Sequence, residues 1–174
     1  ANCLTMDITK GPNGNNIWET KLIITTGLKL EAGKTYKLSL DAYSLNGQEM
    51  EFLFSRADGE NFSALYGQML SPNEKKNFSV TVTPDTTSVL SIVVQAGKLA
   101  ETNGQALLQI SNVKIAEVDG ETKTLNFVAG APAVTNEGDG AGSMTISDGK
   151  LVYDMTAIST TDYHNKLFLE GITF

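Results

Sequence analysis

A chain of 174 residues is long enough to bury a sizeable core as one domain, or as one domain with part of a second, without disulfide bonds. Its 41% of hydrophobic residues exclude a disordered chain, and its net charge of −7 argues against a nucleic-acid partner, which needs a clustered basic face. The single cysteine, Cys3, excludes an internal disulfide and a thiolate metal cluster, and no run of roughly 18 apolar residues is present to span a membrane.

The first part of the chain reads as short strands separated by turn residues. Strands are predicted over 4–9 and 18–24, with a loop between them. The clearest stretch is 27–44, where a tight turn at 31–33 precedes a strand of strict alternation. The residues predicted to face a core are Tyr36, Leu38, Leu40 and Ala42, and those predicted to face solvent are Lys37, Ser39, Asp41 and Tyr43.

The same pattern continues to residue 118. Further strands are predicted at 50–56, 76–83, 89–95 and 106–118, and within 62–70 a strand is predicted around 64–66. The last of these is expected to bulge near Ser111 and Asn112. Short strands with turn residues between them are typical of an all-β sandwich or barrel.

The composition changes after Val118, and the end of the chain repeats its beginning. Gly-rich stretches at 129–133 and 136–142 precede predicted strands at 143–146 and 150–155. Residues 151–156 then match 4–9, and 165–172 match 20–28, which indicates tandem copies of one β-domain. Residues 120–174 therefore either complete the first sandwich or begin a second module. Since a half-module would expose unpaired strand edges, we favour one compact unit over 1–174.

Four motifs, taken in order, resemble the carbohydrate-binding modules of families 4, 9 and 22. They are Trp18 with Leu22, and the stretches 27–30, 33–42 and 110–115. The resemblance covers residues 1–118 and implies an all-β jelly-roll sandwich of two antiparallel sheets, with a cleft across one sheet for a single glycan chain. It implies non-catalytic binding of xylan or a related β-1,4-glycan, a covalently linked glycoside hydrolase such as an endo-xylanase, and a location outside the cell or on the surface of a bacterium.

Two departures from the family pattern bear on metal binding. The usual opening strand, Gly-(Asp/Asn)-x-Phe-Glu, is missing before Ala1, and its nearest match, 126–128, lacks the Glu. Ser111 stands where the closing motif usually has Asp. Because these two carboxylates help to hold a structural calcium in the family, and calcium needs charged oxygen ligands, we predict no cofactor and keep calcium as the alternative.

Sugar recognition needs a ring face for the apolar side of a pyranose and planar polar groups for its hydroxyls. The predicted carbohydrate-binding residues are Trp18, Tyr43, Gln95, Arg56, Asp41 and Tyr66. The resemblance makes Trp18 the main stacking platform; its alternative is a core position. Tyr43 is expected to be the second platform, on the solvent face of its strand, and its alternative is a cross-strand filler.

No catalytic arrangement stands out in the sequence. His164 has no Cys or His neighbours to build a zinc site and no orienting acid for Ser–His catalysis. Glu49 and Glu51 show no sign of the buried, paired state that a glycosidase needs. The competing interpretation is thus a structural or adhesin-like β-sandwich repeat that contacts proteins, which a buried Trp18 would favour.

Overall fold

The computed structural model describes residues 2–11, 15–128, 130, 132–137, 141–157 and 166–173. The strands of this part are β1 (Cys3–Lys10), β2 (Lys21–Leu30), β3 (Tyr36–Ser44), β4 (Gln48–Ser55), β5 (Asn61–Leu70), β6 (Glu74–Val82), β7 (Ser88–Gln95), β8 (Ala106–Glu117), β9 (Thr122–Thr124), β10 (Ala133–Glu137), β11 (Ala141–Ser147), β12 (Lys150–Ala157) and β13 (Lys166–Glu170). Two short 3-10 helices, η1 (Ile17–Glu19) and η2 (Ala100–Thr102), accompany them. Neither helix is long or apolar enough to cross a membrane.

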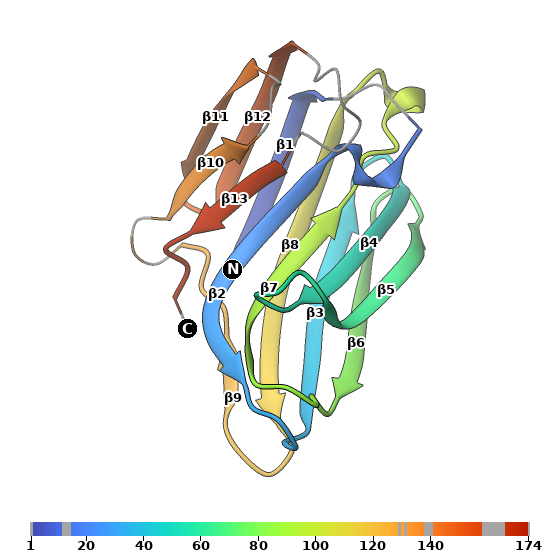
Figure 1. Cartoon of the computed structure of the whole chain (residues 1–174). Coiled ribbons are helices and arrows are strands. Elements are labelled where there is room, and N and C mark those ends of the chain that lie inside the picture. Colours follow the sequence, from blue (N-terminus) through green and yellow to red (C-terminus); the bar gives the residue numbers. More distant parts are fainter. Residues whose placement is uncertain are drawn as a thin grey trace.

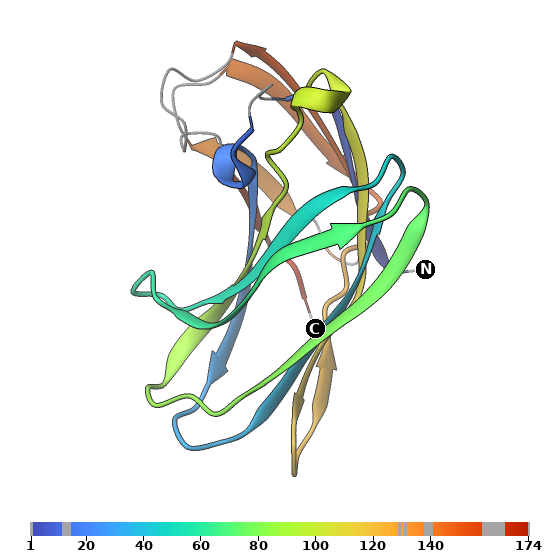
Figure 2. The ribbon, with the colours of Figure 1, turned by 90° about the vertical axis from the view of Figure 1, so that its right-hand side faces the viewer.

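The strands form two sheets that face each other (Figures 1 and 2). One sheet has the order β11-β12-β1-β8-β3-β6, with β9 paired to β8, and the other has the order β10-β13-β2-β7-β4-β5. The predicted all-β jelly-roll sandwich is therefore confirmed. Neighbouring strands are antiparallel except at β1–β12 and β2–β13, which are parallel.

Alternating strands supply the core from both sheets. In β3 the four residues predicted to face inward are at most 5% exposed, as their alternation with polar residues requires. Phe52 of β4 and Phe78 of β6 meet across the sandwich with ring centroids 5.0 Å apart. The predicted bulge of β8 is confirmed: its register with β3 shifts between Ser39 and Asp41, and Asn112 has a φ of 52°.

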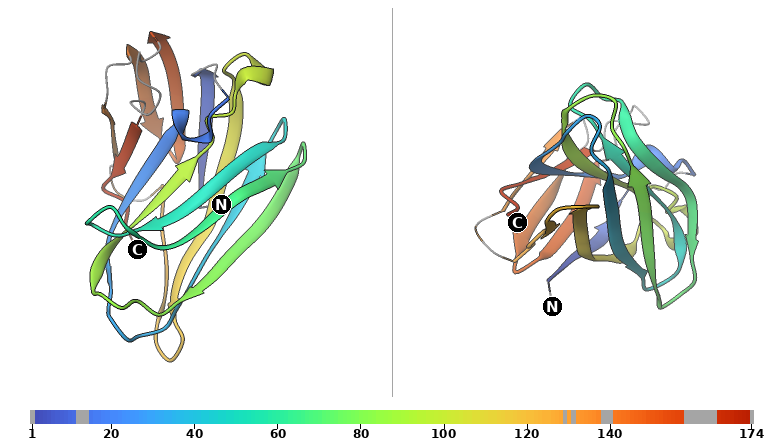
Figure 3. Two further views of the ribbon diagram at one scale, coloured as in Figure 1. Left: turned by 45° about the vertical axis from the view of Figure 1, so that its right-hand side comes forward. Right: turned by 90° about the horizontal axis from the view of Figure 1, so that it is seen from below.

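The C-terminal strands lie at the edge of the sandwich remote from β5 and β6 (Figure 3). They extend both sheets: β12 joins β1, and β13 joins β2. In the second pair Lys166 is opposite Lys21 and Leu167 opposite Leu22, so that the repeated stretches lie side by side. The core cluster of the first part also includes Leu125, Phe127, Leu151, Tyr153, Leu167, Leu169 and Ile172.

Several elements differ from the sequence prediction. Trp18 lies in η1 and not in a strand, and β5 extends well beyond the strand predicted around 64–66. β10 includes the last residue of the first predicted Gly-rich connection and the first two residues of the second. Parts of those connections, and His164, lie outside the described residues.

Candidate functional site

The outer face of the six-stranded sheet carries an apolar row that crosses the strands. Register and alternation place one outward-facing residue of each strand in this row, namely Phe168, Ile23, Val93, Leu53 and Ala64, from β13 to β5. Four strand spacings of about 4.8 Å make the row roughly 19 Å long. The face that the sheet turns away from the core is thus apolar along a line perpendicular to its strands.

Two polar rows border the apolar one. On one side lie Lys166, Lys21, Gln95 and Glu51. On the other side lie Thr25, Ser91, Ser55 and Asn61. This arrangement suits an elongated ligand that has an apolar face and polar edges.

A groove of about 360 Å³ lies over these rows. Its lining residues are Lys21, Ile23, Leu53, Ser55, Arg56, Ala57, Gly59, Asn61, Ser91, Val93, Gln95 and Lys166. The volume falls within the range of small-ligand sites, about 300–1,000 Å³. Two of the predicted site residues, Gln95 and Arg56, therefore line one groove, and we call it the sheet groove.

Trp18 lies in η1, directly before β2, and its side chain is 42% exposed. Backbone bonds from Gly97 N to Ile17 O (2.8 Å) and from Ala96 N to Thr20 O (3.1 Å) hold η1 against the end of β7. A Cβ on Gly97 would lie 2.5 Å from the carbonyl oxygen of Asn16, so this close approach depends on glycine. Because Trp18 is 42% exposed, the alternative that it is a core residue is excluded. Trp18 does not line the sheet groove, but the backbone of η1 is bonded to the two residues that follow Gln95.

Gln95 is 8% exposed and lies between Lys21 and Glu51 in the polar row. Burial lowers the pKa of Lys21, and the neighbouring charge of Lys166 lowers it further. Glu51 accepts a hydrogen bond at Oε1 from the backbone N–H of Gly67 (3.3 Å). This side of the groove offers an amide and ammonium groups to a ligand.

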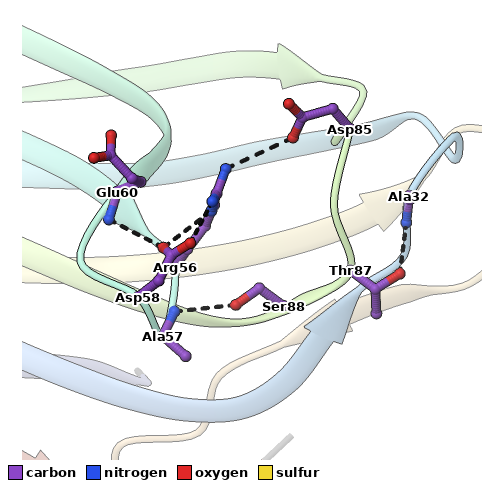
Figure 4. A network of polar contacts seen from close by, with 8 residues as sticks. All are labelled: Ala32, Arg56, Ala57, Asp58, Glu60, Asp85, Thr87 and Ser88. Atoms are coloured by element: carbon purple, nitrogen blue, oxygen red, sulfur yellow. Dashed lines mark hydrogen bonds and ion pairs between the residues drawn. The ribbon is translucent and has the colours of Figure 1, made fainter.

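Arg56 follows β4 and is held by two acidic side chains (Figure 4). Its Nε donates to Asp58 Oδ1 at 3.1 Å, its Nη2 also bonds Asp58, and its Nη1 lies 3.6 Å from Asp85. The hydrogen bonds to Asp58 raise the pKa of Arg56 against a smaller opposing effect of burial. Much of the guanidinium is thus already engaged, although Arg56 contributes to the groove wall.

Tyr66 belongs to the same sheet as the groove, but it lies on the edge strand β5 and is 61% exposed. Its neighbour Gly67, with a φ of 60°, is bonded to Glu51. Tyr66 therefore lies at the outer side of the sheet, beyond the groove lining.

Tyr43 and Asp41 lie on the other sheet, because β3 belongs to the seven-stranded sheet. Tyr43 donates its hydroxyl hydrogen to Asn73 Oδ1 at 3.0 Å and lines a separate hollow of about 360 Å³. Asp41 accepts hydrogen bonds from Asn77 (2.7 Å) and Asn112 (2.6 Å). The structure thus does not bring these two residues together with Gln95, since alternation tells inward from outward but not which sheet a strand joins.

Burial opposes the ionisation of Asp41, but its hydrogen bonds outweigh that effect. Asn77, Asn112 and Lys75, whose Nζ lies 3.3 Å from the carboxylate, together lower the pKa of Asp41. The carboxylate is thus fully used within its own sheet, next to the β8 bulge.

The sequence analysis missed the residues of the apolar row. Ile23 and Val93 sit in runs of consecutive β-branched or aliphatic residues, 22–24 and 92–94. Such runs indicate a strand that is apolar on both faces. These two runs are the sequence signal that predicts an apolar stripe on the outer face of this sheet.

No three His, Cys, Asp or Glu side chains gather as a possible metal site among the described residues.

The carbohydrate-binding domain family, modules 4 and 9, matches residues 7–104. Similar solved structures include the ligand-free PbXyn10C carbohydrate-binding module, with a TM-score of 0.48, 17% identity, and coverage of 71% of this chain and 72% of that chain. A structure described as "CBM4 structure and function" has a TM-score of 0.46, 19% identity, and coverage of 62% and 66%. No curated protein matches the chain. Because the family match extends over more than half of the residues, the chain belongs to the carbohydrate-binding domain family of modules 4 and 9.

Proposed function

We propose that the protein binds a single chain of xylan or a related β-1,4-glycan in the sheet groove. The observation that carries the proposal is the apolar row, bordered on both sides by polar rows, across the outer face of the sheet. The C–H faces of the sugar rings would pack on the apolar row, and the hydroxyls at the edges of the chain would bond the polar rows.

Trp18 and Gln95 have the main roles in this proposal. The exposed ring of Trp18 extends the apolar surface beyond the groove, as a stacking platform at the end where Gln95 lies. The Gln95 amide both donates and accepts, so it can pair with a hydroxyl in either sense. Tyr66 would contact the chain only where the chain runs past the edge strand β5.

The biological role that fits such a module is targeting. A non-catalytic module that holds a linked glycoside hydrolase, such as a xylanase, near its polysaccharide raises the effective concentration of substrate. We propose this role, outside the cell or at the bacterial cell surface. A buried Trp18 would have favoured the competing role as a protein-contacting repeat, so the 42% exposure of Trp18 supports glycan binding instead.

The first test is affinity electrophoresis in gels that contain xylan, β-glucan or mannan. We expect one glycan to retard the protein, and we expect Trp18→Ala and Leu53→Ala to weaken that binding about tenfold, which corresponds to about 1.4 kcal/mol. The matched control is Tyr43→Ala, which removes an aromatic ring from the opposite sheet and should leave retardation unchanged. Retardation by none of the glycans, or equal loss in the control, would contradict the proposal.

A further inference from the structure

The charged residues that line the sheet groove are cationic, although the protein as a whole is acidic. Among the described residues, the lining of the groove contains Lys21, Arg56 and Lys166 and no Asp or Glu, although the chain carries a net charge of −7. Arg56 is neutralised by Asp58 and Asp85. The other positive charges of the described lining are those of the two lysines.

Lys21 and Lys166 stand directly opposite each other on adjacent parallel strands, β2 and β13. Both side chains are only partly exposed, and neither forms an ion pair with a described side chain. Like charges on directly opposite residues of a sheet are destabilising. The two charges therefore repel each other, and no ion pair with a described side chain offsets this repulsion.

The surroundings of Lys21 offer no counter-charge close by. Its other register partner is the neutral Gln95, and Glu51 lies one strand further away. Burial and the charge of Lys166 lower the pKa of Lys21, in keeping with a cation that lacks a partner. On the far side of Lys166, its register partner on β10 is Glu137.

We propose that Lys21 and Lys166 form a subsite for a carboxylate of the bound polysaccharide, so that the preferred ligand is a β-1,4-glycan bearing uronic acid groups. This inference rests on the proposed binding of a glycan in the sheet groove. A carboxylate has two oxygens and accepts a hydrogen bond from each ammonium group, which replaces their repulsion by two attractions. The Gln95 amide beside Lys21 would bond a neighbouring hydroxyl.

The subsite requires both copies of the repeat. Lys21 belongs to the first copy and Lys166 to the second, and the two meet because β13 pairs with β2 in the register of the repeat. Phe168, the next residue of β13 on the same face, extends the apolar row in the same way. The C-terminal strands thus add a charged end to the groove.

The experiment compares glucuronoxylan with the same polysaccharide after its carboxyl groups have been reduced to alcohols. The two polymers share one backbone and differ in charge. We expect the native polymer to bind about threefold to tenfold more tightly at low salt, because ion pairs of partly exposed groups are individually modest. The preference should shrink at about 0.3 M salt, where screening is strong.

Substitutions of the two lysines test whether they cause the preference for the native, charged polymer. Lys21→Met and Lys166→Met should abolish the preference for the native polymer while binding of the reduced polymer persists. Lys29→Met is the matched control, because it removes the same charge from an exposed position of the same strand outside the groove.

The outcomes separate this inference from the proposed function. Equal binding of both polymers, a preference that survives Lys21→Met, or a preference lost in Lys29→Met would overturn the carboxylate subsite and leave the groove intact as a neutral glycan site. Binding of neither polymer would overturn the proposed function as well.

Discussion

Tyr153 carries a polar hydroxyl group into the apolar core. Its side chain is 1% exposed on β12, and its hydroxyl has no hydrogen-bond partner among the described residues. Burying an unpaired hydroxyl costs about 1–3 kcal/mol. In the repeat, the matching residue of the first copy is the apolar Met6, also buried, so this position needs no polar group.

We therefore predict that Tyr153→Phe stabilises the protein by about 1–3 kcal/mol at neutral pH. Burial raises the pKa of Tyr153 from 10.0 to about 12. Because the unfolded chain ionises near pH 10.0 and the folded protein only near 12, ionisation favours the unfolded state between these values. The free energy of unfolding of the wild type is therefore unaffected below pH 10.0 and falls as the pH rises through about 12. Urea unfolding should show the gap between variant and wild type widening by up to about 2–3 kcal/mol over that range. A gap that stays constant with pH would contradict the account.

The β11–β12 hairpin shows how one turn fixes an element. Asp148 and Gly149 have φ angles of 48° and 75°, as expected for the two-residue turn that suits a hairpin. The carbonyl of Gly149 accepts a hydrogen bond from Thr5 N at 2.6 Å, which ties the turn to β1. A Cβ on Gly149 would lie 2.3 Å from the carbonyl oxygen of Cys3, so the contact leaves room only for glycine.

Gly149→Ala is therefore expected to loosen β12 from β1, because backbone must move against backbone. The matched control is Gly59→Ala, at a φ of 89° with open space around the added methyl group. The control should cost about 1–2 kcal/mol from backbone strain alone, and Gly149→Ala should cost more. Hydrogen exchange of the β12 amides should rise only in Gly149→Ala. Equal cost and equal exchange in the two variants would show that the Cys3 contact is unimportant.

Strands were predictable wherever alternation was clean. The bounds of β3, β7 and β8 follow from alternation or from apolar runs that end at turn residues. β5 was underestimated because Gly67, with a positive φ, interrupts its pattern at a register shift. The candidate site was harder to predict from the sequence than the strands were. Tyr43 and Gln95 both lie near strand ends, but the sheet that each strand joins depends on pairing between distant segments of the chain.

At the scale of the whole molecule, both sheets and one core cluster include the C-terminal strands. Leu169 of β13 is fully buried in that cluster. We propose that residues 120–173 belong to the same folding unit as the first part, because separating them would expose these apolar side chains to water.

Leu169→Ala tests this proposal. If the protein unfolds as one unit, the variant should lose about 2–5 kcal/mol, and the fluorescence of Trp18, in the first part of the chain, should report the loss. Glu170→Ala, on the exposed next residue, should change stability by less than about 0.5 kcal/mol. A Trp18 transition that does not move in Leu169→Ala would mean that the two parts unfold separately.

The separation of the two outer faces has a practical consequence. Cys3, the only cysteine of the chain, lies partly exposed on β1, in the sheet opposite the groove. A thiol-reactive tether would therefore anchor every molecule through the same residue of the seven-stranded sheet. On a sensor chip or bead coated in this way, the sheet groove would face the solution uniformly, and the protein could serve as an oriented capture reagent for polysaccharides.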